Sequence, residues 1–261
     1  MTGNLQTKRD DRVLIAINSD PATRNAISWD FYDAFRTCVE AAGRDPAVGA
    51  LVLTGAGGFF SAGGNINGLR ERATLDLAER RASVEKLHAM IRAMRACPKP
   101  IVAAVEGGAA GAGASLALAC DLIVASQDAY LSIAYVKIGL TPDGGATVFL
   151  GRAVPRQLLA EMAMTGDRIP VERLHALGVI NELVAPGAAL DAAVQRAAAL
   201  AAGPPQALAA IKRLIDAAPQ NTLEAQLELE ADSIARAIGG AEGREGIAAF
   251  LEKRRPVFRT E

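Results

Sequence analysis

The chain has 261 residues, of which 51% are hydrophobic and 22% charged, and its formal net charge is -1. This length is ample for one sizeable core, which excludes a small scaffold that depends on disulfides or a structural metal. Because 28 basic residues are scattered among 29 acidic ones, the sequence offers no basic stripe for nucleic acid. Glycine and alanine are abundant while aromatic residues make up only 4%, which indicates close backbone packing or main-chain contacts with a ligand.

Short aliphatic runs alternate with helical patterns along the first half of the chain. Aliphatic and β-branched runs predict strands at 12–17, 50–53, 101–105 and 122–125. Helical spacing of apolar residues predicts helices at 29–42, 65–72, 83–96 and 116–120. Strands that alternate with helices are typical of a parallel sheet, so we expect an α/β fold.

Beyond Gly145 the pattern becomes mainly helical. Period and composition predict helices at 153–164, 171–177, 190–202, 206–217 and 223–238, with one last strand at 179–184. A Gly-Pro-Pro break at 203–205 separates the last part of the chain from the rest. We therefore expect a core over residues 1–200 and a helical lid or oligomerisation region over 201–261.

The ends and the cysteines of the chain predict a cytoplasmic protein. The first twelve residues are polar and charged, without the apolar segment of a secretory signal. No stretch approaches the roughly 20 apolar residues of a membrane span, so we expect no membrane partner. Cys38, Cys97 and Cys120 are odd in number and far apart, which predicts buried or half-buried thiols rather than disulfides.

Two glycine-rich segments, at 55–64 and 107–113, each leave a predicted strand and enter a predicted helix. Peptide N–H groups at such a helix start lack intrahelical partners and can hold an anion or a developing oxyanion. Neither segment matches the phosphate-binding loop of nucleotide hydrolases or the full dinucleotide fingerprint. Each could also be a tight turn with close helix packing, but two of them suggest a shared pocket.

The order and spacing of several motifs resemble one family. The matching segments are Asp20–Ser28 (DPATRNAIS), 51–55 (LVLTG), 60–64 (FSAGG), 99–107 (KPIVAAVEG), 117–121 (ALACD) and 138–145 (IGLTPDGG). Together they resemble the enoyl-CoA hydratase/isomerase (crotonase) superfamily from about residue 12 to the C-terminus. The likeness is strongest to members of phenylacetate breakdown, namely isomerases and alternative oxepin-CoA-type enzymes.

This resemblance implies a crotonase-like spiral of ββα units with a C-terminal helical region that builds homotrimers or dimers of trimers. It implies acyl-CoA thioesters as substrates, with coenzyme A entering as part of the substrate and no permanently bound cofactor or metal. It also implies an oxyanion hole made by the backbone N–H groups of Gly64 and Ala112. Residues near the CoA moiety would be Arg24, Ala26, Ala62 and Ile66.

The chain departs from the hydratases of the family at two positions. Where those enzymes carry glutamates that position water and move its proton, this sequence has Ser115 and Tyr135. A hydroxyl and a phenol have pKa values far from neutrality and are poor general bases. We therefore expect both to line the substrate site without acting as the acid/base pair of a hydratase.

One carboxylate remains, that of Asp143, at a position where isomerases of the family keep a single acid/base. A single carboxylate can remove a proton from one carbon and return it to another, so we expect isomerisation of an enoyl-CoA or of a ring. Burial raises the pKa of a carboxyl group, and we expect this burial from Ile138, Leu140 and Val148. A Pro-Asp-Gly turn alone could also explain this aspartate.

Other functions stay open on the sequence. One is an enoyl-CoA hydratase of fatty-acid or aromatic-acid degradation, and another is an acyl-CoA binder without catalysis. Ser115, Asp143 and His175 also occur in the order of an α/β-hydrolase triad, although no sharp elbow directly precedes this serine. His88 and His175 lie on helical patterns, where we expect neighbouring groups to satisfy them.

Overall fold

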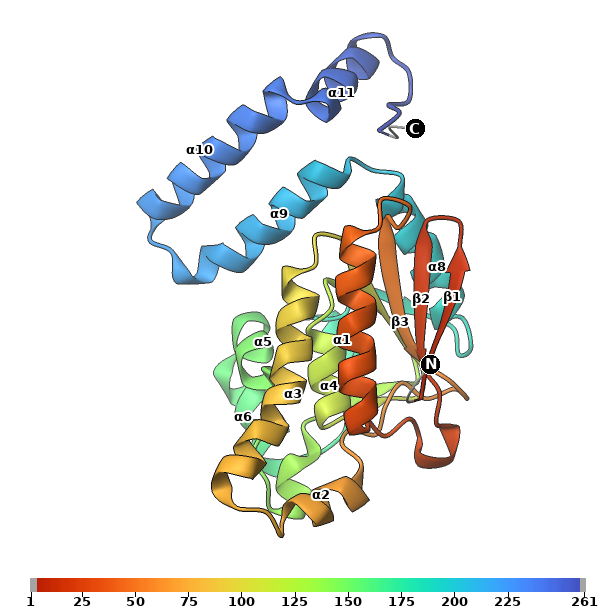
Figure 1. Ribbon diagram of the computed structural model, residues 1–261, viewed down its shortest axis with the longest axis vertical. Coiled ribbons are helices and arrows are strands. Elements are labelled where there is room, and N and C mark those ends of the chain that lie inside the picture. The colour runs from red at the N-terminus through yellow and green to blue at the C-terminus, as the bar shows by residue number, and fades with distance from the viewer. Residues whose placement is uncertain (1–3, 259–261) are drawn as a thin grey trace.

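The computed structural model describes residues 4–258, and its centre is a six-stranded sheet in the order β1-β2-β3-β4-β6-β9 (Figure 1). Five of these strands run parallel, and β1 pairs antiparallel with β2 at one edge. The strands are β1 (Leu5–Asp10), β2 (Val13–Asn18), β3 (Ala50–Gly55), β4 (Ile101–Val105), β6 (Leu122–Ser126) and β9 (Glu182–Val184). A second sheet joins three short strands, β5 (Ala109–Ala110), β7 (Tyr130–Ser132) and β8 (Ile169–Pro170).

One face of the large sheet packs against helix α8 (Ala189–Ala201). The helix presents alanine at every fourth position, and these four side chains are buried: Ala189, Ala193, Ala197 and Ala201. Alternate strand residues meet this stripe, among them Val13, Ile15, Val52, Val102 and Val124. These four alanines thus allow a close helix-to-sheet contact.

The opposite face is covered by helices α1 (Trp29–Arg44) and α3 (Leu77–Ala96), which lie side by side in Figure 1. Their apolar faces bury large side chains, including Phe31, Phe35, Leu87, Met90 and Met94. Side chains cap both helices at their N-termini: Ser28 accepts from Phe31 N, and Asp76 and Glu79 form a capping box. These two helices and the sheet form a rigid frame on which the loops of the site rest.

The shorter helices are α2 (Ile66–Arg72), which precedes α3, and α4 (Ala112–Leu118), α5 (Ala146–Ala153), α6 (Arg156–Thr165) and α7 (Val171–His175), which follow it. Three 3-10 turns also occur: η1 (Pro21–Thr23) before α1, η2 (Ala134–Ile138) before α5, and η3 (Ala218–Gln220) after α9. The last helices, α9 (Pro205–Ala217), α10 (Leu223–Gly239) and α11 (Ala241–Leu251), extend away from the sheet at one end of the molecule (Figure 1). Within residues 4–258, no helix has the length and apolar character needed to cross a membrane.

Helix α9 is fastened to the core by a buried ion pair. Lys212 Nζ lies 2.8 Å from a carboxylate oxygen of Asp121 and donates to Met94 O at 3.0 Å. Asp121 also accepts from Arg95 at 3.3 Å and from Ile101 N at 2.9 Å. A lysine buried to this extent needs such partners, so the contact fixes where the C-terminal region begins to leave the core.

We expect Lys212→Met to lower the free energy of unfolding by about 3 kcal/mol, because it removes one partner of a buried pair while Asp121 keeps Arg95. Urea unfolding at one fixed protein concentration measures this loss. Lys137→Met is the matched control, since Lys137 pairs with Asp167 on the exposed surface. Equal shifts in the unfolding midpoint of the two variants would show that the Lys212 contact stabilises the fold no more than an exposed ion pair does.

The predicted elements agree with the structure in kind; the differences concern where some elements begin or end and several elements that were not predicted. The helix predicted at 153–164 is confirmed as α6, which begins three residues later because Val154 is extended before Pro155, whereas α5 was not predicted. The helix predicted at 116–120 begins earlier, at Ala112, and the last strand covers only 182–184 of the predicted 179–184. Strand β1 was not predicted, because five of its six residues are exposed and it shows no apolar alternation.

Candidate functional site

Two loops far apart in the sequence run side by side at the carboxyl ends of β2 and β3. Ala62 N donates to Arg24 O at 2.8 Å, and Ile27 N donates to Gly63 O at 2.7 Å. The pairing ends where Asn65 N donates to Ile27 O at 3.2 Å. The residues expected near CoA therefore do come from adjoining segments, with Arg24 and Ala26 on one loop and Ala62 and Ile66 on the other.

These four residues differ in exposure. Arg24, Ala62 and Ile66 are exposed. Ala26 is buried, and its N–H donates to Thr23 Oγ1 at 3.1 Å. The guanidinium of Arg24 lies over the Phe59 ring, 5.5 Å from its centre. This contact holds the cation at the surface beside the paired loops.

Asn25 joins the two loops, and the sequence analysis did not single it out. Its side-chain amide donates to Ala56 O at 2.8 Å and to Phe59 O at 2.5 Å. Its backbone carbonyl accepts from Ser61 Oγ at 2.9 Å. The residue is fully buried with φ at +57°. Asparagine is among the few non-glycine residues that adopt this conformation, which is the one signal that could have pointed to it.

The glycine loop and the start of α4 meet at Gly63. This glycine has φ at +93°, and a Cβ placed on it would lie 2.6 Å from Ala110 O and 3.3 Å from Ala112 N. The loops are joined there, because Ala110 N donates to Ser61 O at 2.9 Å. Within the described part of the chain, the N–H groups of Gly64 and Ala112 donate to no protein acceptor. Both remain available to an incoming oxygen atom.

A compact cluster of hydroxyl and carboxyl groups joins α4, η2 and the loop before α5. Tyr135 Oη donates to Asp143 Oδ1 at 2.6 Å. Ser115 Oγ donates to the backbone carbonyl of Asp143 at 2.9 Å and lies 3.1 Å from Tyr135 Oη. Ser115 is the fourth residue of α4, one turn after Ala112. The structure thus brings together all three residues that the sequence analysis named here.

The surroundings of Asp143 raise its pKa above that of an ordinary aspartate. Burial is the main cause, and the hydrogen bond from Tyr135 opposes it. The charges of His88 and Arg72 also lower this pKa. Because the net direction is upward, the Asp143 carboxylate is a stronger base than an exposed aspartate.

The expected source of this burial was wrong. Ile138, Leu140 and Val148 are 53%, 43% and 49% exposed, so they do not enclose the carboxyl group. Tyr135 and Ser115 do, since both are buried and in contact with Asp143. The predicted upward direction of the pKa is confirmed, and burial is its cause, but the three aliphatic residues are not the source of that burial.

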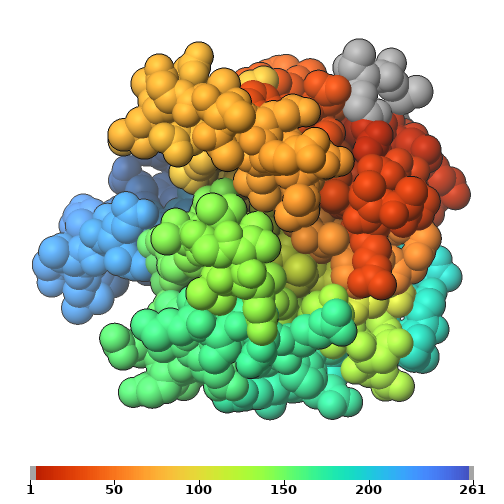
Figure 2. Space-filling model, turned by 90° about the horizontal axis from the view of Figure 1, so that it is seen from below, coloured from red at the N-terminus to blue at the C-terminus, as the bar shows by residue number. Residues whose placement is uncertain are grey.

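Two more groups, Tyr32 and Arg72, interact electrostatically with Asp143, and the apolar pattern of the sequence did not indicate either of them. Burial together with the charge of Asp143 raises the pKa of Tyr32 to about 12, while Arg72 lowers it. Arg72 also lies over the ring of Trp29, at 5.4 Å. Figure 2 shows this end of the molecule, where the orange surface of α2 and the start of α3 lies beside the green surface around residues 130–145.

Glu106 and His175 serve the scaffold. Glu106 accepts from Gly187 N at 3.2 Å and from Ala189 N at 2.8 Å, which occupies both oxygens of its carboxylate at the start of α8. The Nδ1 atom of His175 lies 2.8 Å from Ile180 O, as expected for a histidine satisfied by its neighbours. Ser115 instead contacts Tyr135 and Asp143. Ser115 and His175 therefore do not form the hydroxyl-to-imidazole relay of a serine hydrolase.

Neither metal ligands nor disulfides occur in the described part of the chain. Over residues 4–258, no group of three or more His, Cys, Asp or Glu side chains is arranged to hold a metal ion. Cys38 is half-buried, and Cys97 and Cys120 are buried, all three as free thiols, as predicted. Burial raises the pKa of each of these thiols.

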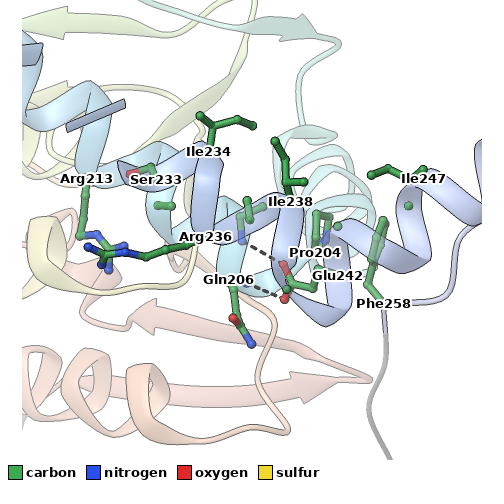
Figure 3. A pocket seen from close by; sticks show the side chains of 16 residues that line it. Pro204, Gln206, Arg213, Ser233, Ile234, Arg236, Ile238, Glu242, Ile247 and Phe258 are labelled. Carbon is green, nitrogen blue, oxygen red and sulfur yellow. Dashed lines mark hydrogen bonds between the residues drawn. The ribbon is translucent and has the colours of Figure 1, made fainter. Parts of the chain in front are cut away.

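A separate hollow of about 500 Å³ lies among the C-terminal helices, lined from α9, α10 and α11 (Figure 3). At its edge, Glu242 accepts from Gln206 N at 2.8 Å and Ala207 N at 3.0 Å and so caps the start of α9. None of the residues discussed above for chemistry lines this hollow. It belongs to the helical region and not to the Asp143 cluster.

Comparison with known proteins agrees with this geometry. The family model described as enoyl-CoA hydratase/isomerase matches residues 12–261. A 1,2-epoxyphenylacetyl-CoA isomerase of Escherichia coli is 37% identical over 239 residues, which cover 91% of each chain. A 2,3-dehydroadipyl-CoA hydratase of the same organism is 32% identical over 256 residues, which cover 98% of each chain. The crystal structure of an enoyl-CoA hydratase from Polaromonas sp. JS666 is 43% identical and superposes with a TM-score of 0.96, covering 98% of this chain and 100% of that one. The chain therefore belongs to the enoyl-CoA hydratase/isomerase family and has the crotonase fold.

Proposed function

We propose that the protein isomerises the double bond, or a strained ring, of an enoyl-CoA thioester, with Asp143 as its single acid/base. The observation that carries the proposal is the isolated carboxylate: Asp143 is held by Tyr135 and Ser115, where a two-glutamate hydratase would have carboxylates. The relative from Escherichia coli named as a 1,2-epoxyphenylacetyl-CoA isomerase supports an isomerase as well.

In this mechanism the thioester carbonyl oxygen accepts from the N–H groups of Gly64 and Ala112. The Asp143 carboxylate removes a proton from a carbon next to the double bond, and the electron pair of the broken C–H bond moves into a dienolate. The two N–H groups stabilise the negative charge on oxygen. Asp143, now a carboxylic acid, returns the proton to a different carbon, which restores the carboxylate and leaves the double bond shifted.

The paired loops are also suited to bind the CoA part of the substrate. We propose that CoA lies along the paired loops, near Arg24, Ala26, Ala62 and Ile66. The exposed Arg24 guanidinium would face the phosphate groups, since a guanidinium group can bind a phosphate through two parallel hydrogen bonds. Ser115 and Tyr135 would form the wall of the acyl pocket beside Asp143. No cofactor beyond the CoA of the substrate enters this scheme.

Incubation in deuterated water with trans-2-, cis-3- and trans-3-enoyl-CoAs and with CoA esters derived from phenylacetate tests the reaction. We expect the double bond or ring to rearrange, with solvent deuterium entering the product and no addition of water. Mass spectrometry of the products distinguishes the two reactions, since hydration adds one water to a 2-enoyl substrate.

A gain of water that persists in the Asp143→Asn variant would contradict the single-carboxylate mechanism and establish the hydratase alternative. Binding of the esters without any conversion would establish the acyl-CoA binder. Release of free CoA that disappears in Ser115→Ala would instead establish a hydrolase, because only that function requires the serine hydroxyl.

We also propose that residues 201–261 join copies of the chain into a trimer or a dimer of trimers. The helices of this region expose large apolar side chains, among them Leu223, Ile234, Ile238, Ile247 and Phe250. Exposed apolar surface of this extent is typical of an interface between subunits. The core over residues 1–200 holds all the residues that we place in the site.

A further inference from the structure

The phenol of Tyr135 makes the shortest side-chain contact with the Asp143 carboxylate. The tyrosine is 8% exposed, and its hydroxyl oxygen lies 2.6 Å from Asp143 Oδ1. It lies in η2, eight residues before Asp143, so a short segment of chain links the two groups. A neutral donor at this distance from a carboxylate forms a strong, charge-assisted hydrogen bond.

The hydrogen atoms of the cluster can be assigned one by one. Ser115 Oγ lies 2.9 Å from the carbonyl oxygen of Asp143 and 3.5 Å from that of Gly111; both can only accept, so the serine hydrogen points to the nearer one. The Tyr135 hydrogen is then free to point at Asp143 Oδ1. In the part of the chain that the structure describes, no group donates to Asp143 Oδ2. The two oxygens of one carboxylate are therefore unequal.

We infer that Tyr135 is a positioning residue that holds Asp143 Oδ1 and thereby leaves Oδ2 as the atom that takes the proton from substrate and returns it. This inference rests on the proposed isomerase function. In the first step the substrate C–H bond breaks and an O–H bond forms at Oδ2. In the second, that O–H bond breaks and a C–H bond forms at another carbon, so the enzyme is unchanged and no other reactant is needed.

Fixing one oxygen matters because a single base must reach two carbons from one place. A free carboxylate rotates and presents either oxygen, which spreads its lone pairs over several directions. The bond from Tyr135, together with the Ser115 bond to the backbone of the same residue, anchors both the carboxyl group and the main chain of Asp143. Such anchoring keeps the reacting atoms in an attacking geometry, where small displacements cost large factors in rate.

Tyr135 is suited to act as a permanent donor. Burial, and next the charge of Asp143, raise the pKa of this phenol above its ordinary value, so it keeps its proton throughout the neutral range. Its hydrogen bond stabilises the charged form of Asp143 and so opposes the effect of burial. Besides Tyr135, the titratable groups that act on Asp143 are His88 from α3 and Arg72 from α2.

Tyr135→Phe tests the inference, because it removes one oxygen atom and keeps the ring. We expect kcat to fall about 10- to 100-fold while KM for the CoA ester stays within about threefold. The acidic limb of the pH–rate profile moves to higher pH, since the carboxylate loses a donor that stabilises its charge. The matched control is Tyr130→Phe, whose hydroxyl makes no hydrogen bond within residues 4–258 and whose variant we expect to keep kcat within about twofold.

A readout without turnover separates this inference from the proposed reaction. Proteins labelled with ¹³C at aspartate carboxyl carbons are titrated by NMR, and the Asp143 signal is identified by its loss in Asp143→Asn. We expect this signal to titrate at higher pH in Tyr135→Phe than in the wild type and at the wild-type pH in Tyr130→Phe. If the NMR titration shifts but the products are hydrated, the positioning role stands and the isomerase function fails.

The inference is overturned if the Asp143 titration is the same in Tyr135→Phe and the wild type, or if kcat is unchanged. A variant with a lower kcat and a higher KM, in which the pH–rate profile and the NMR titration stay unchanged, shows that Tyr135 is only a structural residue. Circular dichroism confirms that the variants compared are folded. Ser115→Ala adds a further comparison, because it removes a bond to the Asp143 carbonyl and should leave the NMR titration of the carboxyl group in place.

Discussion

Asp143→Asn is expected to lower kcat for isomerisation about 10³-fold, because the variant loses the one group that moves the proton. The amide keeps the size of the side chain and an oxygen that can accept from Tyr135, so the pocket should keep its shape. The dissociation constant for the CoA ester should stay within about threefold, since CoA is bound through other residues. Single-turnover kinetics and calorimetric titration measure the two quantities separately.

The same variant should be more stable than the wild type at neutral pH. A carboxyl group whose pKa is raised on folding contributes full stability below its pKa in the unfolded chain, and this contribution is lost as the pH rises through its folded pKa. Asparagine does not ionise, so the variant escapes this loss. Denaturant unfolding should show a higher free energy for the variant at pH 7 and a vanishing difference well below pH 4. A less stable and inactive variant would leave the turnover result explained by misfolding.

Gly63→Ala is the second large effect, and we expect it to lower kcat about 10²- to 10³-fold, through the oxyanion hole. The new Cβ would lie 2.6 Å from Ala110 O and 3.3 Å from Ala112 N, so these atoms must move apart. Such a shift moves the N–H groups of Gly64 and Ala112 away from the position of the thioester oxygen. Steady-state kinetics with a good substrate measures the loss.

Gly178→Ala is the matched control for Gly63→Ala. Gly178 has φ at +79°, so alanine is strained there as well, but no atom lies within 4 Å of the added Cβ. Both variants should lose stability, of the order of 1–2 kcal/mol, whereas only Gly63→Ala should lose kcat. A parallel loss of kcat in both would mean that general strain, rather than displaced N–H groups, lowers the rate.

The sequence predicted the parallel strands of the large sheet and the helices that cover it, because buried strands and amphipathic helices carry strong periodicity. It did not predict β1, whose pairing with β2 depends on a turn at Asp11, with φ at +46°, and not on apolar residues. It also did not predict α5, and it placed the start of the next helix at residue 153, before the extended Val154 and Pro155 instead of after them.

For the candidate site, the sequence identified which residues take part but not how they touch. Ser115, Tyr135 and Asp143 were named because of motif positions, and the structure places their polar atoms within about one hydrogen bond of each other. The bond from Tyr135 to Asp143 could not be predicted, since η2 and the following loop have no period that fixes side-chain directions. Tyr32 was interpreted only as a core residue of α1, because nothing local to it indicates a distant carboxylate.

The alanine stripe of α8 has a consequence for reading a mutational survey of this protein. Gly49, whose added Cβ would lie 2.5 Å from Ala201 Cβ, shows how little space remains between helix and sheet. Larger side chains on the stripe would overpack this layer at a cost of about 1–3 kcal/mol each. Their cellular effect would be a lower amount of folded protein with an intact specific activity. Sensitivity to substitution along α8 would thus resemble that of Asp143 in a growth screen, and only activity per folded molecule would distinguish the two.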